Sequence, residues 1–132
     1  MQIDFAVLAD HALIDQQGKL SVIGIFQVVH VTRFPAMHPR AHLVLRVSGR
    51  RTEIGDHPVR IRFVGPDGAE VFGGQGSVRF GEPPAGVTTV EAAAVLVFDV
   101  PFSRPGSYHF EITLDDGPAL HLPVIAVPRS TD

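Results

Sequence analysis

Histidine is the residue type in this sequence that is best suited to chemistry. The chain has seven histidines and no cysteine, so a transition-metal site would need imidazole and carboxylate ligands. His38 and His42 have the i, i+4 spacing that brings two side chains together on a helix. However, Pro39 lies between them, and His42 begins a predicted strand, in which four residues span about 13 Å. We therefore interpret both as solvated side chains.

A second pair, His109 and His121, lies on the outer face of two adjacent predicted strands, with Glu111 between them. The predicted register places the two histidines several residues apart, so they would make only a weak surface metal site. His11 faces Gly24 in the first predicted hairpin and is interpreted as a packed or hydrogen-bonded imidazole. We accordingly predict no metal site and no cofactor.

No segment has the pattern of a nucleophilic or phosphate-binding enzyme site. The closest approach is 74–78 (Gly-Gln-Gly-Ser-Val), which lacks the second glycine of a nucleophile elbow. The glycines in 73–76 have no lysine and no following helix to hold a phosphate. The adjacent acids Asp115 and Asp116 stand at a hairpin turn, where Asp commonly bonds to the backbone. We predict that the protein is not an enzyme.

Arginines form the remaining local feature. Arg46, Arg60 and Arg62 occupy outward positions on two consecutive predicted strands, and Arg50 and Arg51 lie in the loop between them. If these strands pair, the five guanidinium groups form one wall that could bind phosphate or carboxylate groups. The alternative is a solvated surface in which nearby acids pair with them, of small energetic value.

Short strands must position these side chains. Thirteen glycines and eleven prolines recur between runs rich in Val, Ile, Leu and Phe, a pattern typical of all-β sandwiches. We predict an all-β fold, a single antiparallel β-sandwich of about eight strands of immunoglobulin-like, Greek-key type. The domain spans 1–128, with 129–132 as a C-terminal tail. The approximate strand ranges are 3–15, 20–31, 41–48, 58–64, 69–79, 88–100, 107–115 and 119–127.

Tyr108 is the only tyrosine in the chain, and it opens a predicted strand two residues after Gly106. This arrangement is typical of a tyrosine corner, in which the phenol hydrogen-bonds to nearby backbone. The alternative is a core aromatic whose hydroxyl reaches the edge of the core. In the hairpin that follows, a three-residue loop at 116–118 puts the apolar side chains of both strands on one face. That register places His121 opposite Thr113.

The first predicted hairpin is apolar on both faces, whereas a half-exposed antiparallel strand should alternate. In the predicted register Leu13 lies opposite Val22. Three explanations remain open: a bulge at Gly24 that switches the strand between sheets, a cover provided by the 80–88 loop, or a subunit interface. The residues that would form this interface are Leu8, Val22, Ile23, Ile25, Phe26 and Val28.

Composition limits the function classes. The formal net charge is −3, and aromatic residues do not interleave the arginines, so we predict no nucleic-acid partner. The N-terminal segment does not have the pattern of a secretory signal, and no apolar run approaches the length of a membrane helix. We predict a cytoplasmic protein without a membrane partner. The absence of cysteine suits a reducing compartment.

Two segments near the N-terminus, 5–12 (FAVLADHA) and 18–26 (GKLSVIGIF), resemble the opening of an uncharacterised bacterial family. Its members share a Leu-Ala-Asp-x-Ala pattern, a Gly-Lys-Leu turn and a second strand with a glycine near its middle. The turn at 65–68 (GPDG) and the segment 105–110 (PGSYHF) are similar as well. The resemblance implies a small stand-alone β-sandwich and no known activity.

These features favour a non-enzymatic protein-interaction or structural module that binds a copy of itself, or another protein, through the first hairpin. The alternative function is a sandwich that binds a small anionic ligand with its arginines. Oligomeric state, or a strong salt dependence of ligand binding, would distinguish the two.

Overall fold

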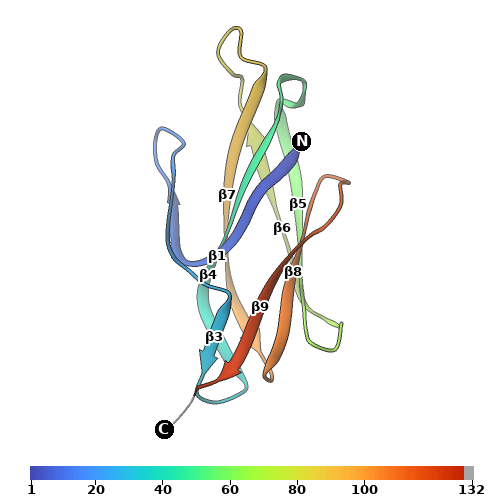
Figure 1. The fold of residues 1–132 in the computed structure, drawn as a ribbon. Coiled ribbons are helices and arrows are strands. Elements are labelled where there is room, and N and C mark those ends of the chain that lie inside the picture. The colour runs from blue at the N-terminus through green and yellow to red at the C-terminus, as the bar shows by residue number, and fades with distance from the viewer. Residues whose placement is uncertain (130–132) are drawn as a thin grey trace.

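The fold is described from a computed structural model, which covers residues 1–129. Figure 1 shows two layers of strands packed face to face, so the predicted all-β sandwich is confirmed. The strands are β1 (Gln2–Ile14), β2 (Leu20–Ile25), β3 (Val28–Val31), β4 (Ala36–Arg50), β5 (Gly55–Val64), β6 (Glu70–Phe80), β7 (Thr89–Phe102), β8 (Gly106–Leu114) and β9 (Leu120–Pro128). A single 3-10 turn, η1 (Arg51–Glu53), joins β4 to β5.

The two sheets have four and five strands. The four-stranded sheet has the order β2-β1-β4-β7, and the five-stranded sheet has the order β3-β9-β8-β5-β6. Every pairing is antiparallel except that of β3 with β9. Strands β1, β4 and β7 thus correspond to A, B and E of an immunoglobulin-like Greek key, and β9, β8, β5 and β6 correspond to G, F, C and C′. Consecutive strands β4 and β5 therefore lie in different sheets.

The core lies between the sheets and follows the two-residue period of the strands. On β4, Leu43, Leu45 and Val47 all point inward and are fully buried. Each such side chain stabilises the fold by about 1.5–3 kcal/mol. From the facing sheet, the ring of Phe63 stacks on Tyr108 with 5.4 Å between centroids.

Tyr108 forms the tyrosine corner that its position predicts. Its hydroxyl donates a hydrogen bond to the carbonyl oxygen of Arg104 at 2.7 Å. The ring is buried against Phe63 and Phe102. The corner fixes the crossing from β7 to β8, where the chain passes from one sheet to the other.

The predicted strand 20–31 is two strands, because the chain changes sheets within it. The N–H of Phe26 still donates to Leu8 of β1, whereas the carbonyl of Gln27 accepts from Ile125 of β9. Gly24, two residues earlier, has φ +72°, and a Cβ there would lie 2.6 Å from Asp10 Oδ2. One of the three explanations predicted a switch between sheets at Gly24. The chain does switch sheets, but about two residues later, at 26–27.

Both hairpin registers differ from the predicted ones. In the first hairpin Leu13 lies opposite Ser21, a shift of one residue. In the last hairpin His121 lies opposite Glu111, a shift of two residues that leaves every side chain on its predicted face. A left-handed residue at Asp115 (φ 52°) begins a longer loop than the one predicted.

Within residues 1–129, none of the helical structure is long and apolar enough to cross a membrane. Of the predicted C-terminal tail, only Arg129 is described, and its N–H donates to the carbonyl of Val31 at 2.8 Å. Residues 130–132 lie outside the described residues.

Candidate functional site

Part of the outer face of the four-stranded sheet is apolar, although this face lies away from the core. Strand registers place side chains in rows across this face. A half-exposed sheet normally carries polar residues there. One row consists of Ile25, Ala9, His42 and Val97, and the next consists of Val7, Val44 and Val95.

The exposed apolar residues are concentrated at the two edges of this face. Ile23 and Ile25 on β2 are 62% and 60% exposed, and Val97 on β7 is 45% exposed. Between them, Ala9 and Val44 are fully buried. Figure 1 shows the β1–β2 hairpin standing away from the rest of the two layers. The hairpin therefore presents its isoleucines to solvent.

Of the six predicted interface residues, the structure brings only some to this surface. Leu8 is 2% exposed and belongs to the core, so its assignment as an interface residue is wrong. Leu8 is an even-numbered residue of β1, and in this part of the strand the even-numbered side chains face the core. Phe26 is also misassigned as a surface residue, because it packs on the core and stacks on His38 at 4.7 Å. Val28 is exposed but lies on β3, in the other sheet.

Val22 is half-buried and pairs with Ala12, so it lies on the opposite face of the hairpin from Ile23. The predicted cover is absent as well. The 80–88 loop instead packs at η1, where Arg51 Nη1 donates to the carbonyls of Pro84 and Val87. The two-sided apolar hairpin is therefore left uncovered within the described residues.

The hairpin tip is held by its own loop. Asp15 Oδ1 accepts hydrogen bonds from the N–H groups of Gln17 and Lys19 at 2.8 and 2.9 Å. The N–H of Gly18 (φ +79°) donates to the carbonyl of Asp15 at 3.0 Å. These bonds complete a three-residue loop that fixes the register.

The predicted arginine wall does not form, because β4 and β5 do not pair. Arg46 lies on the four-stranded sheet and pairs with Glu91. Arg60 and Arg62 lie on the five-stranded sheet. Arg50 ends β4, and Arg51 begins η1.

Most of the positive charge at these positions already faces acids. Arg62 donates to Glu70 at 2.8 Å and to Glu111, and Arg51 lies 3.7 Å from Glu82. Glu70 and Glu111 raise the pKa of Arg62, and the hydrogen bond to Glu70 is the largest cause. The arginines are thus dispersed over the molecule and do not converge on one ligand.

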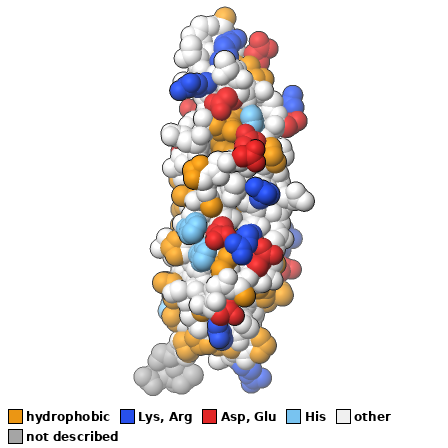
Figure 2. All heavy atoms as spheres, turned by 90° about the vertical axis from the view of Figure 1, so that its right-hand side faces the viewer, with side chains coloured by type: hydrophobic (Ala, Val, Ile, Leu, Met, Phe, Trp, Pro, Cys, Tyr) orange, Lys and Arg blue, Asp and Glu red, His pale blue; other side chains and the backbone are white. Residues whose placement is uncertain are grey.

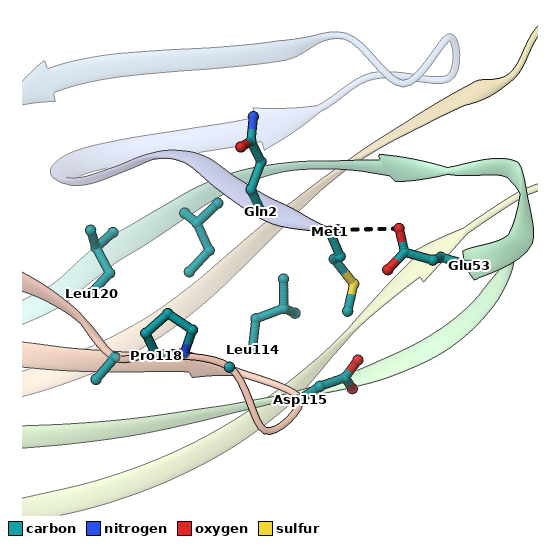
Figure 3. Close-up of a pocket in the computed structure, with 10 residues that line it drawn as sticks. Met1, Gln2, Glu53, Leu114, Asp115, Pro118 and Leu120 are labelled. Carbon is teal, nitrogen blue, oxygen red and sulfur yellow. Dashed lines mark ion pairs between the residues drawn. The ribbon is translucent and has the colours of Figure 1, made fainter.

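One open pocket lies at the end of the sandwich where β1 begins (Figure 3), with a volume of about 470 Å³. Its walls come from the start of β1, from Glu53 and from the β8–β9 loop, including Pro118 and Leu120. The α-amino group of Met1 lies 3.2 Å from Glu53 Oε1. The lining is largely apolar and holds no nucleophile beside a base.

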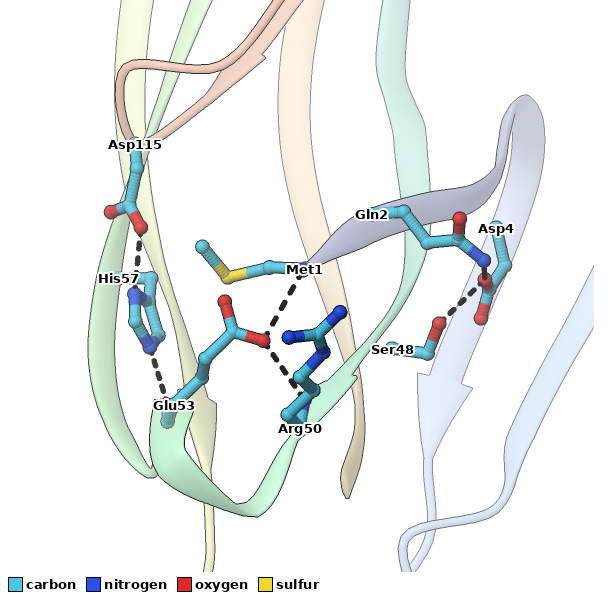
Figure 4. Close-up of polar contacts among 8 residues, drawn as sticks. All are labelled: Met1, Gln2, Asp4, Ser48, Arg50, Glu53, His57 and Asp115. Carbon is cyan, nitrogen blue, oxygen red and sulfur yellow. Dashed lines mark hydrogen bonds and ion pairs between the residues drawn. The ribbon is translucent and has the colours of Figure 1, made fainter. Parts of the chain in front are cut away.

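Next to this pocket, His57 links two elements (Figure 4). Its Nδ1 lies 2.8 Å from Asp115 Oδ2, and its Nε2 lies 2.6 Å from the carbonyl oxygen of Glu53. Both ring nitrogens face acceptors, which favours the doubly protonated imidazolium. The bond to the Glu53 carbonyl, followed by Asp115, raises the pKa of His57 against the effect of burial. Because both nitrogens are occupied, the ring is not free to act as a base.

The five-stranded sheet carries a different cluster on its outer face. His109 and His121 stack with 5.0 Å between ring centroids, and their Nε2 atoms lie 3.4 and 3.9 Å from Glu111 Oε1. Figure 2 shows histidine, acidic and basic side chains gathered together on this side of the molecule. Partial burial raises the pKa of Glu111, but hydrogen bonds from His109 and Arg62 outweigh it, so the net shift is downward.

The remaining histidines occupy different positions from those predicted. His42 is buried, and its Nδ1 lies 2.8 Å from the carbonyl oxygen of Arg40, so its interpretation as solvated is wrong. A register shift between His38 and Ala41 separates it from His38. His11 lies opposite Ile23 and packs edge-on against His42 at 5.2 Å.

Taken together, the fold and surfaces define an immunoglobulin-like β-sandwich with one apolar and one charged outer face. Residues 4–127 match a family of unknown function, DUF6941, and the chain belongs to this family. The predicted membership of a family of unknown function is thereby confirmed. No curated protein matches the chain.

Proposed function

We infer that this protein is a non-enzymatic interaction module that self-associates through its first hairpin, by pairing of the β2 edge with the β2 edge of a second copy. The observation that carries this function is the exposure of Ile23 and Ile25 on the edge strand β2, since they are the two most exposed large hydrophobic residues among those described. Contiguous apolar surface on a soluble domain commonly marks an interaction site.

The backbone of β2 adds a second reason. β2 is an edge strand of its sheet, so one side of it has unpaired N–H and C=O groups. Proteins usually protect such edges with charged residues or proline. The six residues of β2, LSVIGI, include neither, so this edge is a template for pairing with another strand.

A second copy of the chain fits this edge best. Two β2 strands can pair antiparallel about a two-fold axis, because both the edge and the apolar face are self-complementary. No like charges oppose one another within such a pair of strands.

The test is the solution mass measured by light scattering over a concentration series. We expect the wild-type mass to rise towards twice the chain mass, because paired β2 strands set Ile23 and Ile25 of the two copies beside one another and satisfy the free backbone groups of the edge. Ile25→Asp should remain a folded monomer over the same range. A charge at the centre of an apolar interface would weaken association by at least about tenfold.

Val71→Asp is the matched control, because Val71 is 43% exposed on β6 at the edge of the other sheet. It should associate as the wild type does. A wild-type protein that stays monomeric at every concentration would overturn self-association, and so would an equal loss in both variants.

A further inference from the structure

We propose that His109, Glu111 and His121 form a binding site for a divalent transition-metal ion of the zinc class, on the outer face of β8 and β9. The site is independent of the proposed self-association, since it lies on the opposite sheet. Neither the fold nor the family membership assigns it.

Strand geometry brings the three ligands together. His109 and Glu111 are two residues apart on β8 and so point to the same side of the sheet. Glu111 and His121 are directly opposite each other on β8 and β9, where Cβ atoms lie about 5 Å apart. One ligand atom from each residue lies within 4.8 Å of the other two.

The separations are close to those that a metal requires. Ligand atoms about 2.0–2.2 Å from a tetrahedral ion lie about 3.3–3.5 Å from each other. The His109 Nε2 to Glu111 Oε1 distance is already 3.4 Å, and that from His121 Nε2 is 3.9 Å. The side chain of His121 is 59% exposed, so a small rotation can close the remaining gap.

The surrounding charges favour a cation. Glu111 and Glu70 both pair with Arg62, which leaves two carboxylates against one guanidinium. Glu111 binds Arg62 through Oε2 and faces the histidines through Oε1. Arg62 thus holds the carboxylate from behind, as outer-shell partners of metal ligands do. Arg60, the other nearby cation, lies on the same face of the adjacent strand β5, opposite Thr113, two residues along from Glu111.

The donor set selects the metal. Two imidazoles and one carboxylate suit Zn²⁺, Ni²⁺, Cu²⁺ or Co²⁺, whereas Mg²⁺ and Ca²⁺ prefer a shell of oxygens. Three protein ligands leave at least one position for water, so the site is open in the manner of other three-ligand zinc sites.

Isothermal titration of the full chain with Zn²⁺ tests the site. We expect one Zn²⁺ per chain, a rise in Tm with Zn²⁺, and no response to Mg²⁺. His109→Gln and His121→Gln should each weaken binding by at least about tenfold. Both side chains are outside the core, so the variants should keep the wild-type circular dichroism spectrum and the Tm measured without metal.

His30→Gln is the matched control, because His30 is an exposed histidine on β3. It should bind Zn²⁺ as the wild type does. The absence of any heat or Tm change with excess Zn²⁺ would overturn the site. Binding that persists unchanged in a His109→Gln/His121→Gln double variant would do so too.

Discussion

At the scale of single residues, one hydroxyl group fixes a crossing between the sheets. The Tyr108 hydroxyl bonds to a backbone carbonyl in a buried setting. Tyr108→Phe should lower the free energy of unfolding by about 1–3 kcal/mol, because the carbonyl of Arg104 loses its partner. Urea unfolding measures this difference.

The contrasting variant is Arg104→Ala. The hydrogen bond involves the main chain of Arg104, and its side chain makes only an exposed pair with Asp67 at 3.9 Å. This substitution should change stability by less than about 1 kcal/mol. Equal effects of the two variants would contradict the role of the corner.

His57 makes stability depend on pH. Its pKa is raised in the folded protein above the ordinary value of 6.5. The stability that its protonated form supplies is therefore fully present below pH 6.5 and is lost as the pH rises through the folded-state pKa. The difference in unfolding free energy between wild type and His57→Gln should shrink across this window.

The His57 ring resonances followed by NMR give the same pKa directly. Asp115→Asn should lower that pKa, since it removes a negative charge 2.8 Å from Nδ1. An imidazole that titrates at or below 6.5 in the wild type would contradict this interpretation.

At the scale of elements, Gly24 lets β2 pass close to Asp10 of β1. Gly18→Ala should cost about 1–2 kcal/mol, the price of a left-handed alanine, since its Cβ would meet nothing within 4 Å. Gly24→Ala should cost at least about 1 kcal/mol more, because its Cβ would clash with Asp10.

A double-mutant cycle isolates that clash. Asp10→Ala should recover part of the loss caused by Gly24→Ala, giving a favourable coupling of about 1 kcal/mol. Additive effects of the two substitutions, measured by urea unfolding, would show that backbone strain alone determines the cost.

Most strands could be predicted from the sequence, because Gly and Pro mark the turns and β-branched residues fill the intervals. The tyrosine corner could be predicted as well, from Gly106 and Tyr108. The register of the last hairpin could not, since a slip of two residues leaves the apolar pattern of each face unchanged. The predicted register therefore placed the two histidines several residues apart and missed that His121 lies directly opposite Glu111.

The prediction of an arginine wall was wrong because of the strand topology. Consecutive strands usually pair, so Arg46 and Arg60 seemed to share a face. The Greek key sends β5 to the other sheet, and no local signal in 51–54 distinguishes a hairpin from such a crossing. The break at 26–27 could be predicted only approximately, as a switch at Gly24, because Phe26 and Val28 continue the apolar run of β2.

At the scale of the whole molecule, the two sheets present surfaces of opposite character. The four-stranded sheet has apolar rows outside, beside the Arg46–Glu91 pair, and the five-stranded sheet carries arginines, acids and histidines. Self-association and Zn²⁺ binding should therefore be independent. Ile25→Asp should bind Zn²⁺ with unchanged affinity, and His121→Gln should keep the wild-type solution mass. A changed Zn²⁺ affinity in Ile25→Asp, or a changed solution mass in His121→Gln, would contradict the placement of the two sites on separate surfaces.

The central claim is that two copies pair through their β2 edges. Amide hydrogen exchange of residues 20–25, measured below and above the concentration at which the mass doubles, tests it most directly. We predict that the β2 amides not bonded to β1 exchange more slowly at high concentration, while those of the β6 edge do not change. Exchange in β2 that is the same at both concentrations would contradict the claim.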